Sequence, residues 1–456
     1  MLAGECAVEE FLTVMRGESH DYEELAVDYL KAGLWSDCIA LLELAVENCA
    51  AVSPLVWYYM AYAADKNGDG QLAEKLAKMG EECCPDYCFP NRLEDVQVLS
   101  RIMALNPAGG YAYYYLGNLW YDKRQYDDAL WCWERSAELL PEYPIVRRNL
   151  ALAYYNKFNR SADAVTVLEK AFELNPKDSR IFMELDQLYK RLNYAYEQRL
   201  ANFEANAEIV ALRDDLYLEQ ATLLNQLGRH QEALDMIAAR KFHPWEGGEG
   251  KVPAQYVICR RELAKQYIAC GKAEDALRLL DECREYPWNL GEGKLPAAQE
   301  NDIDYFAGCA CEVLGDRARA EGYFNAAVKG LDELGDAMYY NDQQPDKILY
   351  RGMAMLKLGR ESEAKALFER FVAYGQEHMN DNVKIDYFAV SLPDLLIWEG
   401  DLNVRNKVHC NYMSGLGYLG LGDYEQASMA LGKAYELDKN HQGVQYHLSM
   451  VQEMKM

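Results

Sequence analysis

The feature that most constrains this chain is a block of residues whose pattern recurs along it. The clearest copy runs from Pro107 to Pro141 and reads PAGGYAYYYLGNLWYDKRQYDDALWCWERSAELLP. Its repeated positions are, in order, Tyr113, Leu116, Gly117, Trp120, Ala129, Trp133 and Pro141. Small residues let two helices approach closely, aromatic rings fill the space beside them, and proline stops the second helix. The block therefore predicts two antiparallel helices joined by a short turn.

The same spacing recurs further along the chain, which separates it from a chance match. The recurring small and apolar positions are Leu150, Ala151, Tyr154, Ala164 and Ala171; Ala221, Leu224 and Ala233; Ala264, Tyr267, Ala276 and Leu280; Gly308, Ala320, Phe324 and Ala327; Gly352, Ala364 and Phe368; and Gly415, Tyr418, Ala427 and Ala434. Between paired helices, glycine can supply the left-handed conformation that ends a helix. The candidates for these turns are Gly228, Gly271, Gly315, Gly359 and Gly422.

We therefore expect an all-α fold: an α-solenoid, or superhelical array, of about ten helix-turn-helix repeats that bury their apolar faces against one another. The expected segments are degenerate helical repeats in 1–105, regular repeats in 106–242, repeats with elongated joints in 243–378, and a connector, a last repeat and a capping helix in 379–456. Residues 186–215 look helical without a glycine turn, and residues 379–407 carry Pro393. Long structureless loops are uncommon inside compact arrays, so we expect an ordered connector at 379–407.

The composition narrows the classes of partner. The 73 Asp and Glu outnumber the 47 Lys and Arg, which gives a net charge of −26. Such a surface repels phosphate backbones, so nucleic acid is not an expected partner, although the same charge can serve solubility alone. The chain has no apolar run near the ~20 residues that span a bilayer, so no membrane partner is expected.

Cysteine usage and the N-terminus both indicate a cytoplasmic location. The 13 cysteines lack the spacing of a disulfide framework, and MLAGECAVEEF lacks the basic and apolar parts of a signal peptide. Reduced thiols are typical of reducing compartments. Cys83, Cys84 and Cys88 lie close together, but no second pair of His or Cys follows at a zinc-like spacing. We expect no metal and no cofactor.

The repeat pattern resembles that of the tetratricopeptide superfamily. More specific stretches, among them FPNRLEDVQVL, FHPWEGGEG, SLPDLLIWEGDLN and HCNYMSGLGYLGLGDYEQA, resemble the C-terminal helical region of large bacterial proteins. Those proteins carry an N-terminal β-rich, sugar-enzyme-like domain of unknown function. The likeness spans about residues 50–456. It implies a repeat array with an interaction role and makes such a β-rich domain a candidate partner.

Arrays of this kind bind ligands in a concave groove lined by the first helix of each pair. The polar and aromatic residues expected there are Tyr114, Asn118, Tyr121, Arg148, Asn149 and Tyr155. Asparagine and arginine can hold a peptide carboxylate or its backbone amides, and tyrosine rings can stack on a peptide or a sugar. The alternative is that these tyrosines pack between helices.

Two similar loops, HPWEGGEGK at His243–Lys251 and YPWNLGEGK at Tyr286–Lys294, interrupt the array. Both follow the second helix of a repeat, so we expect them to be elongated joints with Trp245 and Trp288 buried as wedges. The alternative is a ligand-binding lip made from Trp245, Glu246, Glu249, Trp288 and Glu292. Paired carboxylates there could support glycoside hydrolysis if they lay ~5–10 Å apart.

These features favour a non-catalytic interaction scaffold that binds a protein segment or a partner domain in the groove. The sequence carries no catalytic or nucleotide-binding fingerprint, and GGEG and GEGK lack the spacer and ending of a phosphate loop. The alternative is a carbohydrate-binding or carbohydrate-processing module of glycoside hydrolase type that uses the Trp and Glu loops.

Overall fold

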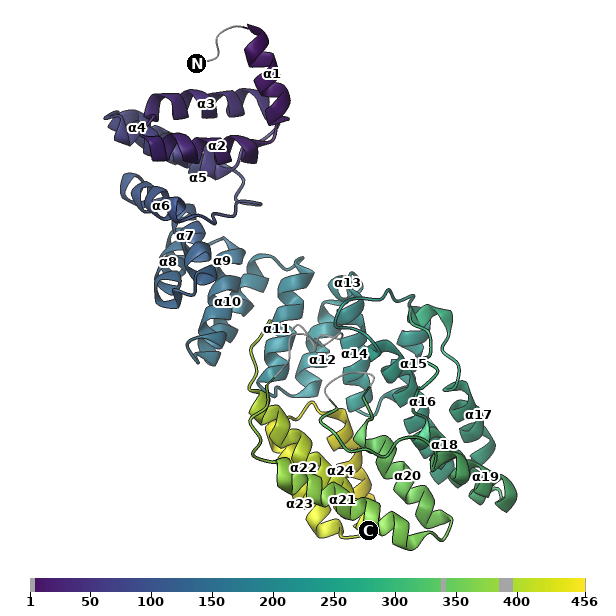
Figure 1. Ribbon diagram of the computed structural model, residues 1–456. Helices are drawn as coiled ribbons and strands as arrows, with labels where there is room; N and C mark the ends of the chain where they lie inside the picture. Colours follow the sequence, from purple (N-terminus) through teal and green to yellow (C-terminus); the bar gives the residue numbers. More distant parts are fainter. Residues whose placement is uncertain (1–4, 338–341, 385–396, 456) are drawn as a thin grey trace. The chain divides into compact units, whose positions relative to one another are not determined.

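The computed structural model describes residues 5–337, 342–384 and 397–455 (Figure 1). Every regular element in these ranges is helical: 24 α-helices and one short 3-10 helix, η1. Within each unit, most successive helices pack on one another, and short turns join the two helices of a typical pair. The predicted all-α array of helix-turn-helix repeats is confirmed.

The first of two compact units, unit 1, comprises Met1–Pro176. Its helices are α1 (Glu5–Met15), α2 (Ser19–Ala32), α3 (Trp35–Asn48), α4 (Pro54–Lys66), α5 (Gly70–Glu82), α6 (Leu93–Leu105), α7 (Tyr111–Asp122), α8 (Tyr126–Leu139), α9 (Pro144–Asn156) and α10 (Ser161–Leu174). Local sequence explains the helix starts. At α4, Ser53 Oγ accepts a hydrogen bond from Leu55 N at 3.2 Å, and Pro54 occupies the first helical position.

The second unit, unit 2, comprises Lys177–Met456. Its helices are α11 (Ser179–Arg191), α12 (Tyr196–Ala205), α13 (Ala207–Val210), α14 (Asp214–Gln226), α15 (His230–Ala239), α16 (Lys251–Ala269), α17 (Ala273–Glu282), η1 (Trp288–Leu290), α18 (Asn301–Val313), α19 (Arg317–Ala327), α20 (Pro345–Lys357), α21 (Glu361–His378), α22 (Leu402–Leu421), α23 (Tyr424–Leu437) and α24 (Gln442–Lys455). The helix predicted near the C-terminus is α24. Of the predicted connector at 379–407, residues 385–396 lie outside the described residues, and residues 402–407 belong to α22.

The two helices of a pair meet where a glycine on the first faces a large side chain on the second. A Cβ on Gly117 of α7 would lie 2.4 Å from Cδ1 of Trp133 on α8. The same arrangement recurs in unit 2, where a Cβ on Gly308 would lie 2.5 Å from Cε1 of Phe324. No real side chain tolerates such distances, so the ring occupies the volume that the glycine leaves empty. The predicted role of the small and aromatic positions is confirmed.

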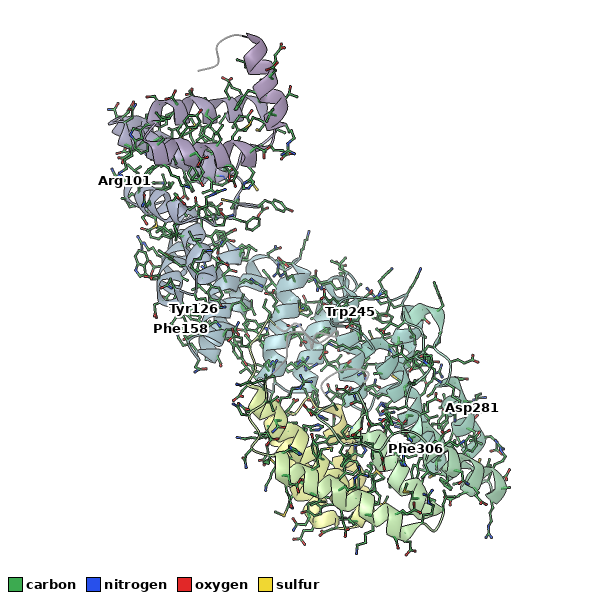
Figure 2. All side chains as sticks on the ribbon, in the orientation of Figure 1. Arg101, Tyr126, Phe158, Trp245, Asp281 and Phe306 are labelled. Atoms are coloured by element: carbon green, nitrogen blue, oxygen red, sulfur yellow. The ribbon has the colours of Figure 1, made fainter. Side chains whose placement is uncertain are left out.

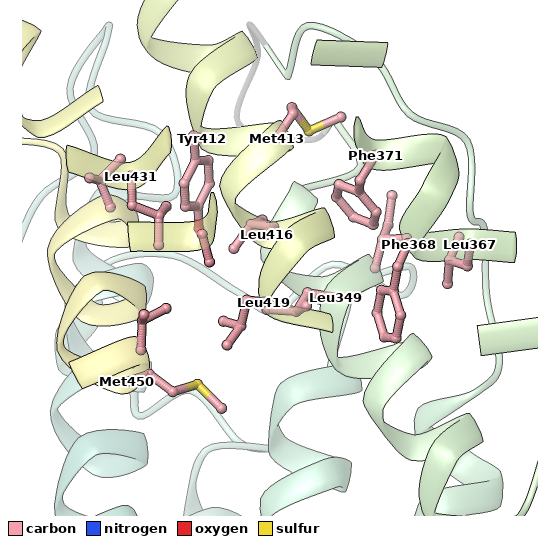
Figure 3. Packing of buried hydrophobic residues seen from close by; sticks show 14 of the residues in the cluster. Leu349, Leu367, Phe368, Phe371, Tyr412, Met413, Leu416, Leu419, Leu431 and Met450 are labelled. Carbon is pink, nitrogen blue, oxygen red and sulfur yellow. The ribbon is translucent and has the colours of Figure 1, made fainter. Parts of the chain in front are cut away.

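The core of the C-terminal helices extends this packing across neighbouring pairs (Figure 3). Phe368 and Phe371 of α21 pack with Leu416 of α22 in one buried apolar cluster. A Cβ on Gly420 of α22 would lie 2.2 Å from Cδ1 of Phe368. Glycine on α22 therefore lets α21 and α22 lie unusually close together.

The turns between paired helices confirm the predicted role of glycine and reveal substitutes for it. Gly228, Gly271, Gly315, Gly359 and Gly422 have φ angles of 74°, 73°, 77°, 73° and 77°. The equivalent conformation is adopted by Arg124, Asn159 and Asn193, with φ of 61°, 53° and 57°. Asparagine tolerates this region better than most residues do. Asn193 thus explains how α11 turns into α12 in the stretch that lacks a glycine.

Replacing the core glycine Gly308 by Ala should destabilise unit 2 by about 1–3 kcal/mol, because the new methyl group collides with Phe324. Gly322 on α19 is the matched control, since a Cβ there has no atom within 4 Å. Gly322→Ala should stabilise the protein by about 0.5–1 kcal/mol, as expected for alanine in an open helix position. Chemical denaturation of both variants provides the comparison. Equal effects would contradict the packing assignment.

Candidate functional site

Two asparagines from neighbouring repeats meet on one face of unit 1. Asn118 lies on α7, one residue after the core glycine, and Asn149 lies on α9. Asn149 Nδ2 donates to Asn118 Oδ1 at 3.0 Å, and Trp133 Nε1 donates to the same oxygen at 3.1 Å. An indole N–H can only donate, so the oxygen and nitrogen of the Asn118 amide are assigned by the network itself.

Arg148 fixes the other end of this network. Its Nη1 donates to Asn149 Oδ1 at 3.2 Å, and a guanidinium also can only donate. The order Arg148, Asn149, Asn118 therefore has one self-consistent direction. Asn118 Oδ1 is used twice, while no partner for Asn118 Nδ2 is found within the described ranges. A partly exposed amide donor is held beside a partly exposed guanidinium.

Of the candidate tyrosines, one is buried between helices and two are partly exposed. Tyr114 is 9 % exposed and meets the Tyr143 ring edge-on at 5.2 Å between centroids. It is a packing residue, as the alternative interpretation expected. Tyr121 lies 5.1 Å from the Trp133 ring and is partly exposed, as is Tyr155. Asn118, Tyr121, Arg148, Asn149 and Tyr155 are called the α7–α9 face below.

The Pro-Trp loops follow α15 and α17, as predicted, and they are hydrogen-bonded to each other. Phe242 N donates to Asn289 O at 2.8 Å, and Asn289 Nδ2 donates to the carbonyl oxygens of Ile237 at 2.8 Å and Arg240 at 2.9 Å. Asn289 therefore satisfies backbone groups that the end of α15 leaves open. The two joints form one structural element.

The expectation that both tryptophans are buried wedges is wrong for Trp288. Its side chain is 86 % exposed, whereas Leu290 is 1 % exposed. The short helix η1 turns Leu290 inward and leaves Trp288 outside, and Asn289 makes the contacts between the joints. Trp245, labelled in Figure 2, is half-buried. Its ring lies over Gly248, where a Cβ would come within 2.1 Å of Cε2.

Four of the five loop candidates do come together. Trp245, Glu246, Glu249 and Glu292, with Pro244, line a hollow of about 270 Å³. Glu292 Oε2 accepts a hydrogen bond from Gly250 N at 2.8 Å. Burial raises the pKa of Glu292, and the nearby Glu249 raises it further. The hollow is acidic, and Trp288 does not line it.

A third polar site, which the sequence did not predict, lies on the surface of unit 2 formed by α11, α12, α14 and α16, which is called the inner face below. Arg199 of α12 is fully buried, and its Nη2 lies 2.7 Å from both Asp186 and Glu219. Its Nη1 donates to Asn440 Oδ1 at 3.0 Å. Arg199 and Asn440 are 241 residues apart in sequence. The spacing within one repeat therefore cannot predict their contact. Elsewhere in unit 2, beside Tyr350 and Tyr412, burial lowers the pKa of His447 to about 4.

The described residues also bear on three other kinds of site, namely a metal centre, a reactive cysteine and a membrane span. They contain no group of three His, Cys, Asp or Glu placed to hold a metal ion. The cysteines whose side chains the structure describes are free thiols, and burial raises the pKa of Cys259 to about 12. None of the helices in these ranges is both long and apolar enough to cross a bilayer.

Comparison with known proteins supports the repeat assignment. Residues 408–441 match the family described as tetratricopeptide repeat. This stretch begins inside α22 and ends at the turn before α24. This part of the chain is therefore similar to a tetratricopeptide repeat. The match includes Gly415, Tyr418, Gly422, Ala427 and Ala434, the positions that define the repeat in the sequence.

Several solved structures align with part of this chain. The crystal structure of YrrB, a tetratricopeptide protein with an unusual peptide-binding site, is 16 % identical over 49 % of this chain and 95 % of that one, with a TM-score of 0.31. MamA from Desulfovibrio magneticus RS-1 is 19 % identical over 43 % of this chain and 97 % of that one, with a TM-score of 0.26. A further MamA crystal structure is 23 % identical over 38 % of this chain and 88 % of that one, with a TM-score of 0.21.

The different settings of the two loop tryptophans predict different stabilities. Trp245→Ala should lower the unfolding free energy by about 1–2 kcal/mol, because the ring covers Gly248. Trp288→Ala should change it by less than about 0.5 kcal/mol, because the ring is exposed. Thermal and urea unfolding of the two variants measures the difference. Equal losses would restore the buried-wedge interpretation for both residues.

Proposed function

We propose that this protein is a non-catalytic interaction scaffold whose α7–α9 face binds a segment of another protein. The observation that carries the proposal is the fixed donor at Asn118 Nδ2. Trp133 and Asn149 hold the amide in one orientation before any ligand arrives. A preorganised donor loses little conformational freedom on binding, which favours affinity.

The chemistry of the face indicates the kind of segment. Asn118 Nδ2 suits a backbone carbonyl or side-chain amide oxygen of the ligand. Arg148 lies at the other end of the network, beyond Asn149, and suits a carboxylate, whether a C-terminus or an acidic side chain. Tyr121 and Tyr155 add partly exposed aromatic surface for apolar side chains. The resemblance to multidomain bacterial proteins makes a β-rich domain the first partner to test.

The carbohydrate alternative has weaker physical support. Trp288 does not line the hollow that holds Trp245 and the three glutamates, so the two rings do not form one sugar platform there. Glu292 already accepts a backbone hydrogen bond from Gly250. We therefore favour the protein-binding role.

Asn118→Asp tests the face while preserving its framework. The aspartate still accepts from Trp133 and Asn149 but loses the exposed N–H donors and gains a negative charge. A peptide selected from a displayed library on the full-length protein should lose at least about tenfold in affinity for this variant. Isothermal titration calorimetry measures the change.

Asn325→Asp is the matched control for charge and residue type. Asn325 lies exposed on α19 of unit 2, where its Nδ2 donates only to Glu321 O at 2.9 Å among the described contacts. This variant should bind the selected peptide as the wild-type protein does. Equal affinities for the wild-type protein and both variants, with unchanged circular dichroism, would contradict the proposed site.

A further inference from the structure

The inner face of unit 2 is in contact with the end of the same chain. The yellow C-terminal helices lie beside the teal α11 and α12 (Figure 1). The contacting stretch, residues 438–446, includes the turn before α24 and the first turns of that helix. It is called the C-terminal segment below. It touches α11, α12, α14 and α16, far away in sequence.

Side chains of the inner face bind backbone groups of the C-terminal segment. Gln226 Nε2 donates to Asn440 O at 3.1 Å, and Tyr196 OH donates to Lys439 O. Gln445 Nε2 of the segment donates back to Gln226 O at 2.6 Å. Amide and hydroxyl side chains that bind backbone carbonyls recognise a chain as a ligand rather than as an apolar core.

Asn440 is the central side chain of this contact. Its Oδ1 accepts from Arg199 Nη1 at 3.0 Å, and its Nδ2 donates to Lys190 O at 2.8 Å. Next to it, Gln255 Nε2 donates to Gln442 Oε1 at 2.7 Å. The receiving groups on α12 and α16 are held in place by their own helices before the segment docks.

The contact is polar and incompletely satisfied. Gln226 Oε1, Gln445 Oε1 and Tyr446 OH are buried without a hydrogen-bond partner within the described ranges. Each such group costs free energy relative to its hydrated state. An interface that must stay closed would be expected to satisfy these atoms, so the fit favours an occupant that can leave.

The apolar side of α24 packs against α22 and α23 rather than against the inner face. Val444 and Val451 of α24 are buried in the cluster that includes Leu416 and Leu431 of α22 and α23. The polar contact can therefore open while α24 stays packed on its own repeat. Repeat arrays contact mainly their sequence neighbours, so such an opening requires only small adjustments between successive repeats.

We propose that the inner face of α12, α14 and α16 is a second peptide-binding site, which the C-terminal segment occupies in cis and can vacate. The ligand class is a polar segment rich in Asn and Gln that presents backbone carbonyls to Tyr196, Arg199 and Gln226. Covalent linkage gives the cis segment a high effective concentration, so a ligand in trans must compete with it. This inference does not depend on the α7–α9 face.

A labelled peptide of residues 436–449 tests the proposal on the full-length protein. Asn440→Ala in the protein removes the contacts with Arg199 and Lys190 and weakens the cis occupant. Fluorescence anisotropy should then show at least about tenfold tighter binding of the wild-type peptide than the unmodified protein shows. The same peptide carrying Asn440→Ala should lose that binding.

Asn325→Ala on α19 is the control and should leave peptide binding at the wild-type level. Gln442→Ala, which removes only the contact with Gln255, is a milder second variant if Asn440→Ala does not fold. It should raise peptide affinity in the same direction by about threefold or more. Folded variants that bind the peptide no better than the wild-type protein would overturn the proposal.

Discussion

The rest of this structure depends on the contact between a glycine on one helix and a large ring on its partner. At Gly117 the ring is Trp133, and at Gly308 it is Phe324. The contact brings the two helices of a pair close enough to exclude water and fixes their relative rotation. At Trp133 it has a second effect, since the same indole donates its N–H to Asn118. The Trp133 side chain therefore both packs the two helices together and orients the Asn118 amide.

Unit 1 and unit 2 use similar helix pairs in different ways. The α7–α9 face of unit 1 presents a fixed amide donor that has no partner within the described ranges. The inner face of unit 2 presents comparable groups, but residues of its own C-terminus already bind them. Under our proposals, the first face is ready for a ligand, and the second becomes available only when the cis segment leaves.

Local features of this fold could be predicted from the sequence because they repeat at short range. The helix pairs, the glycine turns at Gly228 and Gly422, and the position of the Pro-Trp joints all follow from spacing within one repeat. The turn at Asn193 has no glycine, so the glycine pattern did not predict it. The exposure of Trp288 depends on Asn289 binding backbone groups about 50 residues away. The contact of Arg199 with Asn440 depends on how many repeats bend together, which no local pattern specifies.

The claim that packing orients the site is tested most directly by Trp133→Phe. Phenylalanine fills the equivalent position at Phe324 and Phe368, so the ring should still fit beside Gly117 at a cost of about 1 kcal/mol. The variant lacks the N–H that fixes Asn118. We predict that calorimetry will show about a fivefold loss of affinity for a peptide selected on the wild-type protein, with the helical circular dichroism unchanged. Unchanged affinity in the folded variant would contradict the account.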